Sequence, residues 1–232
     1  TLNTMRLLFK SRENGGLQGM PALGRGFGGN GDMPAYWALN QTGTNFAQGT
    51  PCHGSFALRN RETGAALSGP NLTSYGLNGI EDAPIPSPIR NRLKRDLVLV
   101  SMGADKADGS LEWHKGKLQC RYIRHNSPIL SQINNSFDEI AKRSQKPVYY
   151  HDKYLLTVHP LGGARLDEDP QQGVVNALGE VHDNAGLFIA DAAALPASPG
   201  TPPSMTISAW SRHVSTQILN QKSNTQPNRG KK

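Results

Sequence analysis

Apolar residues recur at helical spacing in three stretches of the chain, and each stretch predicts an amphipathic helix. The stretches are residues 1–12, residues 127–144 and the segment that begins near Pro202. The first runs into a Glu-Asn-Gly-Gly sequence, and the other two begin with Ser127 or Thr201 followed directly by proline, which is a common helix start. The apolar residues of the three stretches are Leu2, Met5, Leu7 and Leu8; Ile129, Ile133, Phe137, Ile140 and Ala141; and Ile207, Trp210, Val214 and Ile218.

Shorter apolar runs predict strands between these helices. Lys115-Gly116 separates two of the runs and is expected to be the turn of a hairpin. The strands before residue 123 are expected to form an antiparallel sheet, and the two later runs are expected to be buried strands. The runs are residues 53–58, 97–102, 111–114, 117–122, 155–158 and 187–190.

Two polar residues directly follow the last two runs. His159 comes after residues 155–158, and Asp191 comes after residues 187–190, shortly before the third helix. In open α/β sheets, strand ends and helix N-termini meet where cofactors bind. We therefore expect His159, Asp191 and the N-terminus of the Pro202 helix to lie in one crevice.

Three sequence motifs lie in this part of the chain. Residues 159–163 read His-Pro-Leu-Gly-Gly, residues 186–191 read Gly-Leu-Phe-Ile-Ala-Asp, and residues 203–208 read Pro-Ser-Met-Thr-Ile-Ser. The combination resembles the C-terminal part of glucose–methanol–choline (GMC) flavin oxidoreductases, in particular the cholesterol-oxidase-like branch. The resemblance is dense over residues 155–218 and looser back to Thr1.

The resemblance implies an α+β or α/β fold, in which an antiparallel-sheet substrate domain joins the C-terminal strands and helix of a Rossmann-like FAD-binding domain. Residues 1–12 and 151–222 would belong to the FAD-binding domain, residues 13–150 to the substrate domain, and residues 223–232 to a disordered tail. The chain starts inside a helical pattern with Thr1 and not with an initiator methionine. We therefore expect a C-terminal fragment whose FAD-binding half lies upstream in the same protein.

His159 is the expected catalytic base. Alcohol oxidation requires removal of the hydroxyl proton while a hydride leaves carbon for flavin N5, and histidine suits this proton transfer because it titrates near working pH. One position departs from the family pattern. GMC enzymes usually carry a second His or Asn just before the proline that corresponds to Pro203, whereas this chain has Pro202 there.

Glu81 is the second catalytic candidate. It lies in a Glu-Asp-Ala-Pro-Ile-Pro sequence that is similar to a cholesterol-oxidase segment, in which a glutamate shifts a steroid double bond. A carboxylate in an apolar cavity has a raised pKa and can act as a base. The alternative interpretation of Glu81 is a solvated loop acid.

The resemblance also implies contacts to FAD. Asp191, followed by Ala192, would accept hydrogen bonds from the ribityl hydroxyls, and its alternative role is that of a turn cap. Near Pro203, the N-terminus of the helix would present the unpaired N–H of Ser204 and the positive end of its dipole to the reduced flavin.

Residues 24–29 fit the letters G-x-G-x-x-G, but no strand is predicted before them and no helix after them. We therefore do not interpret them as a pyrophosphate-binding fingerprint. The following residues, Asn30 and Gly31, are similar to a cholesterol-oxidase stretch. There they would let the backbone approach the isoalloxazine ring, and a flexible turn is the alternative.

Composition and charge narrow the choice of partners. The chain has 232 residues, of which 36% are hydrophobic, so it can bury a core. Its net charge is +7, but no aromatic residues accompany the basic cluster at residues 90–95, so a solvated surface is favoured over nucleic-acid binding. No apolar run approaches the roughly 18 residues of a membrane span, the histidines lack metal-site spacing, and the compartment is not indicated.

The sequence thus predicts the oxidation of an alcohol by FAD, with a sterol or another hydrophobic secondary alcohol as substrate and with oxygen or another acceptor reoxidising the flavin. Two alternatives stay open. One is a catalytically impaired fragment or a non-catalytic subunit, and the other is a GMC dehydrogenase acting on sugars or small alcohols. A large apolar pocket beside Glu81 would favour sterols, and a polar one would favour sugars.

The purified 232-residue chain is expected not to retain FAD, because the resemblance places the adenine and pyrophosphate sites upstream of Thr1. An absorbance spectrum recorded after exhaustive dialysis checks this expectation. A chain that stays yellow through dialysis would contradict it.

Overall fold

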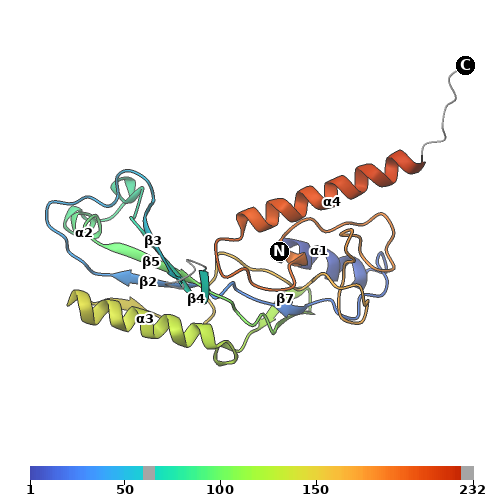
Figure 1. The fold of residues 1–232 in the computed structure, drawn as a ribbon, viewed down its shortest axis with the longest axis horizontal. Coiled ribbons are helices and arrows are strands. Elements are labelled where there is room, and N and C mark those ends of the chain that lie inside the picture. Colours follow the sequence, from blue (N-terminus) through green and yellow to red (C-terminus); the bar gives the residue numbers. More distant parts are fainter. Residues whose placement is uncertain (60–65, 226–232) are drawn as a thin grey trace, which may run out of the picture.

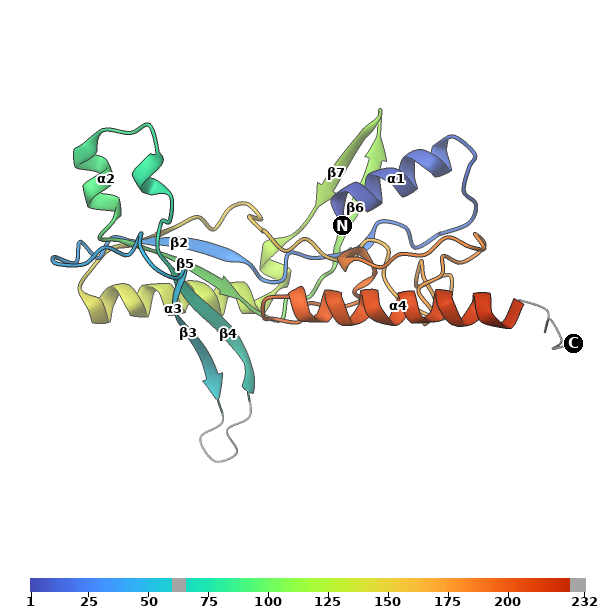
Figure 2. The same ribbon diagram turned by 90° about the horizontal axis from the view of Figure 1, so that it is seen from above.

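The computed structural model describes residues 1–59 and 66–225. Helices and two antiparallel sheets form two lobes along the longest axis of the molecule (Figure 1, Figure 2). The fold class is therefore mixed α and β with antiparallel sheets, as expected. The helices are α1 (Leu2–Glu13), α2 (Ser87–Leu93), α3 (Pro128–Ser144) and α4 (Ser204–Thr225), and the strands are β1 (Arg25–Phe27), β2 (Met33–Trp37), β3 (Cys52–Arg59), β4 (Ala66–Tyr75), β5 (Leu97–Met102), β6 (Gly109–His114), β7 (Lys117–Arg121) and β8 (Val148–Tyr150).

The first lobe is a five-stranded sheet with the order β3-β4-β5-β2-β8, and every neighbouring pair is antiparallel. Helix α3 lies along one face of this sheet (Figure 1). Because side chains alternate along a strand, every second residue of β2 and β5 points toward α3, and Ala35 pairs there with Leu99. The buried core of the lobe consists of Met33, Ala35, Leu72, Leu99, Ile129, Leu130, Ile133 and Phe137.

The second lobe contains α1, α4 and a small sheet with the order β1-β6-β7. Helix α1 packs against the β6–β7 hairpin, where the Phe9 and Trp113 rings stack with centroids 6.5 Å apart. The hairpin was expected in the same sheet as residues 97–102, but this contact places it beside α1 instead. The β6–β7 hairpin therefore lies in the same lobe as α1.

Two predicted strands do not form. Residues 155–158 carry no strand: Leu155 packs against the core of the second lobe, but Leu156 and Val158 are 60% and 77% exposed. Residues 187–190 contain only an isolated bridge between Phe188 and Glu180. Apolar runs become strands only when a neighbouring backbone pairs with them. Here side-chain groups hold residues 157–159 instead, as described below.

Helix α4 begins at Ser204, two residues later than expected. Thr201 is therefore not its N-cap: the first hydrogen bond of the helix joins the Ile207 N–H to the Pro203 carbonyl, and the Thr201 carbonyl accepts from Asn30. The expected apolar face is confirmed, since Val214 is buried and Trp210 packs against the core of the second lobe. The helix continues to Thr225, and the rest of the predicted tail, residues 226–232, lies outside the described residues.

Several other expectations are confirmed by the element bounds. Helices α1 and α3, strand β5 and the β6–β7 hairpin all lie where the sequence pattern places them. The pattern does not reveal β2, β4, β8 or α2. Strand β2 contains a proline, and β4 contains glycine and proline, and these residues weaken a strand pattern.

The Phe137→Ala variant is expected to lose roughly 3–5 kcal/mol of unfolding free energy, because Phe137 is 0% exposed and its removal leaves a cavity between α3 and the sheet. Phe56→Ala is the matched control in the same lobe, because Phe56 is 70% exposed. Urea unfolding of both variants measures the difference. Equal losses in the two variants would show that α3 does not seal the core of this lobe.

Candidate functional site

The centre of the molecule is a tight turn before β2. The Asp32 N–H donates to the Gly29 carbonyl over 3.0 Å, and the two residues between them have left-handed backbones, with φ of +57° at Asn30 and +63° at Gly31. Asparagine tolerates this conformation better than most residues. Gly31 also needs to be glycine for a second reason, since a Cβ would lie 2.8 Å from the Gly103 backbone nitrogen.

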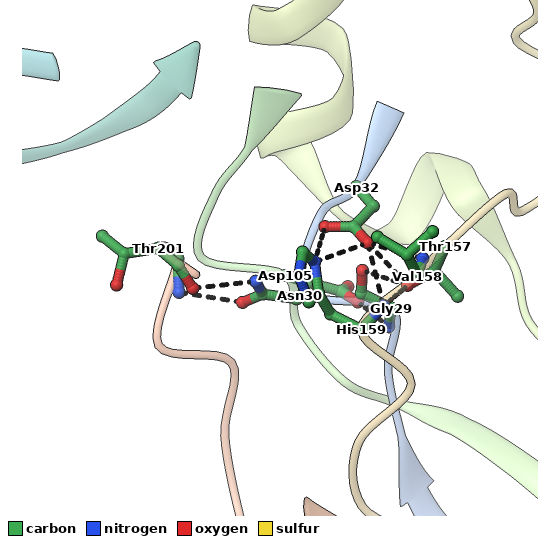
Figure 3. A network of polar contacts seen from close by, with 9 residues as sticks. Gly29, Asn30, Asp32, Asp105, Thr157, Val158, His159 and Thr201 are labelled. Carbon is green, nitrogen blue, oxygen red and sulfur yellow. Dashed lines mark hydrogen bonds and ion pairs between the residues drawn. The ribbon is translucent and has the colours of Figure 1, made fainter. Parts of the chain in front are cut away.

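Asn30 is a fully buried clamp on the segment that leads into α4. Its Oδ1 accepts from the Gly200 N–H and its Nδ2 donates to the Thr201 carbonyl, each over 3.0 Å. Its own backbone carbonyl accepts from the Gly103 N–H at the end of β5. One residue thus connects β5, the turn before β2 and the start of α4 (Figure 3).

Asp32 holds His159. The His159 Nδ1 lies 2.9 Å from both carboxylate oxygens of Asp32. The Asp32 side chain is 2% exposed and the His159 side chain 22%, so the carboxylate is internal and the imidazole reaches the surface. Figure 3 shows Asn30 reaching toward Thr201 while Asp32 reaches toward the segment of residues 157–159.

A second buried carboxylate, Asp105, supports the same turn. Its Oδ2 accepts from the Gly29 N–H at 2.8 Å, and its Oδ1 accepts from the Ser127 and Tyr122 hydroxyls. Burial and the Asp105 carboxylate both raise the pKa of the Tyr122 hydroxyl, which keeps it a hydrogen-bond donor. The start of α3 is thereby tied to the turn at Gly29.

Asp191 lies beside the His159 segment. Its Oδ1 accepts from the Ala193 N–H, and its Oδ2 accepts from the Thr4 hydroxyl. Asp191 is therefore a turn cap, the alternative role expected for it, and its side chain is still partly exposed.

Backbone hydrogen bonds join the segments that carry the candidate residues. The Gly162 N–H donates to the Ala192 carbonyl over 2.9 Å, and the Ala164 N–H donates to the Ala193 carbonyl over 3.0 Å. Ala192 is buried in this contact. The segments of His159 and Asp191 and the start of α4 therefore converge, although neither of the first two is a strand.

Glu81 lies elsewhere. It sits in a 3₁₀ turn, η1 (Ile80–Asp82), beside α2 and at the end of the first lobe that faces away from α4 (Figure 2). Its exposed carboxylate pairs with Lys94 at 2.8 Å. Hydrogen bonds from Lys94 and Asn45 lower the pKa of Glu81, whereas an apolar cavity would raise it. Glu81 thus has the surroundings of a solvated loop acid and lies apart from His159.

An apolar groove of about 800 Å³ lies between the C-terminal half of α3 and the sheet. Glu81 does not line it. Ser127, at the start of α3, lies near the turn at Gly29, and the first α3 residue that lines the groove is Asn135, eight residues later. At about 1.5 Å per residue, this part of α3 lies roughly 12 Å from the start of the helix. Its lining includes Trp37, Phe56, Leu72, Leu99 and Ile140. It is therefore not the pocket of His159.

The described residues hold no group of three or more His, Cys, Asp or Glu that could bind a metal ion. In the same part of the chain, no helix combines the length and the apolarity that crossing a membrane requires.

Comparison with known proteins identifies the family. Residues 100–211 match the family model for the C-terminal domain of GMC oxidoreductases. This part of the chain, which includes α3, His159, Asp191 and the start of α4, therefore belongs to the GMC oxidoreductase family.

Curated relatives cover only part of the chain. A long-chain-alcohol oxidase of Arabidopsis thaliana is 25% identical over 153 residues, which are 65% of this chain and 20% of the relative. A cholesterol oxidase of Mycobacterium tuberculosis is 36% identical over 61 residues, which are 26% of this chain and 11% of the relative. The chain therefore spans a small share of the relatives that it matches.

Solved structures share the fold. A formate oxidase matches with a TM-score of 0.59 and 15% identity, over 88% of this chain and 48% of that one. A pyridoxine 4-oxidase from Mesorbium loti matches with a TM-score of 0.53 and 16% identity, over 87% and 44%. A further structure, with a TM-score of 0.57 and 15% identity over 88% and 48%, concerns the effect of a mutation on FAD modification in the formate oxidase of Aspergillus oryzae.

Sequence reasoning missed Asp32, the residue that touches His159. One signal could have revealed it. Asp32 follows Asn30-Gly31, a typical turn pair, and precedes a run in which apolar residues alternate, so it stands where a turn enters a strand. Its partner at residue 159 is 127 residues away, and no local pattern encodes that pairing.

Asn30→Asp is expected to lower the unfolding free energy by roughly 1–3 kcal/mol, because the new carboxylate cannot donate to the Thr201 carbonyl inside a buried clamp. Amide exchange at Gly200 should also accelerate. Asn3→Asp, at an exposed position of α1, is the isosteric control. Unchanged exchange at Gly200 in the Asn30 variant would rule out the clamp.

Proposed function

We propose that the protein to which this chain belongs oxidises an alcohol with FAD as electron acceptor, and that the chain supplies the base His159 and part of the flavin site. The family of residues 100–211 supports this proposal, as do relatives named long-chain-alcohol oxidase and cholesterol oxidase. The observation that carries it is the setting of His159. Asp32 fixes Nδ1, while the described residues offer Nε2 no hydrogen-bond partner and the ring reaches the surface.

His159 can take the hydroxyl proton of an alcohol. An imidazole whose Nδ1–H donates to a carboxylate has its lone pair on Nε2, and the described residues offer that atom no hydrogen-bond partner. A hydride leaves the alcohol carbon more readily as the hydroxyl oxygen loses its proton to a positioned base. FAD, when bound, accepts that hydride.

The residues present fit a flavin. The first N–H groups of a helix lack partners inside the helix, and at α4 they belong to the exposed residues Ser204, Met205 and Thr206. Together with the helix dipole they favour negative charge, which suits a reduced flavin beyond Pro203. Asp191 is partly exposed and has acceptor capacity left for a hydroxyl group.

On this proposal, the second lobe contributes to the FAD-binding side, and the five-stranded sheet contributes to the substrate side. Asn30 and Gly31 lie between the two. The Asn30 side chain is occupied by its clamp, so any contact of this turn with the isoalloxazine ring would involve backbone atoms.

We further propose a hydrophobic alcohol as substrate and oxygen as final acceptor. The names of the relatives support both points, because they are oxidases of long-chain alcohols and cholesterol. The sheet face that points away from α3 also carries partly exposed apolar side chains, among them Tyr36, Val98 and Val100. Glu81 is not assigned a catalytic role in this proposal, because its carboxylate is already paired with Lys94.

One observation favours a second candidate, a protein with impaired catalysis or with a binding role only. Pro202 stands where GMC enzymes usually carry His or Asn, and proline has no side-chain donor. In the structure Pro202 is exposed just before α4. If no alcohol reduces the flavin of the intact protein, this second candidate is correct.

His159→Ala in the flavin-loaded protein is expected to slow flavin reduction by an alcohol roughly 10²–10⁴-fold, because a positioned base is lost. The measurement is stopped-flow absorbance under anaerobic conditions, with a long-chain alcohol, a sterol and a sugar compared. FAD content should stay the same.

His114→Ala is the matched control, because His114 is exposed on the β6–β7 hairpin away from His159. Reduction at the wild-type rate in His159→Ala would remove His159 from the mechanism. A sugar that reduces the flavin faster than either apolar alcohol would contradict the proposed substrate class.

A further inference from the structure

We propose that Asp32 is the positioning residue of the catalytic base. On this view, Asp32 keeps the proton of His159 on Nδ1, fixes the plane of the ring, and thereby keeps the lone pair of Nε2 directed at the substrate. The inference deepens the proposed function and rests on the role of His159 in it.

The contact joins the buried carboxylate of Asp32 to the partly exposed imidazole of His159. Both Asp32 oxygens lie 2.9 Å from Nδ1, so the ring nitrogen faces the middle of the carboxylate. Asp32 is 2% exposed and does not exchange its partner for water easily, whereas His159 is 22% exposed. The side of the imidazole that carries Nε2 is therefore the open side.

The other partners of Asp32 show which group donates. Its Oδ2 also accepts from the Thr157 hydroxyl at 2.8 Å and from the Val158 and His159 N–H groups at 2.9 and 3.1 Å. Every partner is thus a donor, and a carboxylate surrounded by donors acts as an acceptor only. Nδ1 therefore carries the proton in the contact with Asp32, and Nε2 is left as the proton acceptor.

The position of Asp32 is set before it meets His159. The turn at Gly29 is held by Asp105, and the clamp of Asn30 holds the residue two positions earlier. Strand β2 begins directly after Asp32 and is paired on both sides, with β5 and β8. The carboxylate thus projects from a rigid corner, while residues 157–159 have no strand of their own and depend on it.

The experiment compares two buried carboxylates on the same turn in the flavin-loaded protein. Asp32→Asn keeps the shape, but its amide N–H can donate to Nδ1 and favours the tautomer protonated on Nε2. We expect alcohol-dependent flavin reduction to slow by at least about tenfold, as in the aspartate-to-asparagine change of a Ser-His-Asp triad, where the loss is about 10⁴-fold. FAD content and the apparent KM should change little.

A second readout does not depend on activity. The ¹⁵N spectrum of the His159 imidazole reports which nitrogen carries the proton, and we expect Nδ1 in the wild type and Nε2 in Asp32→Asn. Asp105→Asn is the matched control, because Asp105 is buried and holds Gly29 without touching the imidazole. It should lower stability and leave the tautomer of His159 unchanged.

The outcomes separate the two proposals. If His159→Ala abolishes flavin reduction but Asp32→Asn keeps both the rate and the tautomer, the role of Asp32 is overturned and the proposed function stands. If His159→Ala has no effect, the proposed function fails. If Asp32→Asn does not fold, the wild-type spectrum alone decides, and a proton found on Nε2 overturns the inference.

Discussion

The buried turn at residues 29–32 is the constraint on which the candidate site depends. Asn30 and Asp32 are two residues apart, and both are almost fully buried. One holds the entry to α4 and the other holds His159, so segments from residues 157–159 and 200–201 are positioned by a single piece of chain. A shift of this turn would therefore move His159 and the N-terminus of α4 together. The distance between His159 and the start of α4 would change little.

Polar groups, and not apolar packing, determine this geometry. Asp32 and Asp105 each accept several hydrogen bonds, so neither carboxylate is buried without partners. A buried network that is fully satisfied favours one arrangement, because any other arrangement leaves a donor or an acceptor unpaired in a low-dielectric interior. The apolar cores of the two lobes, on either side of the turn, supply the stability that such a network does not.

The elements that the sequence revealed are those with local signals. Helix α3 has a Ser-Pro start and an apolar face within 18 residues, and the β6–β7 hairpin has its turn within its own sequence. The sequence predicts a strand at residues 155–158, and a strand needs a neighbouring backbone to pair with. Here the Val158 N–H donates to the side chain of Asp32 instead. The motif at residues 159–163 draws attention to His159, but only the folded chain shows which residue it contacts.

Pro202 and Asp32 are linked by the same reasoning. In an enzyme with a His or Asn at the position of Pro202, that side chain would also hydrogen-bond the substrate hydroxyl. The orientation of the catalytic histidine would then matter less. Because Pro202 offers no such donor, the proposed chemistry falls on His159 alone, and its tautomer then matters at every turnover. A single base is effective only if its free nitrogen is the deprotonated one. The buried carboxylate at residue 32 is the one group in contact with the ring that can enforce this, among the residues that the structure describes.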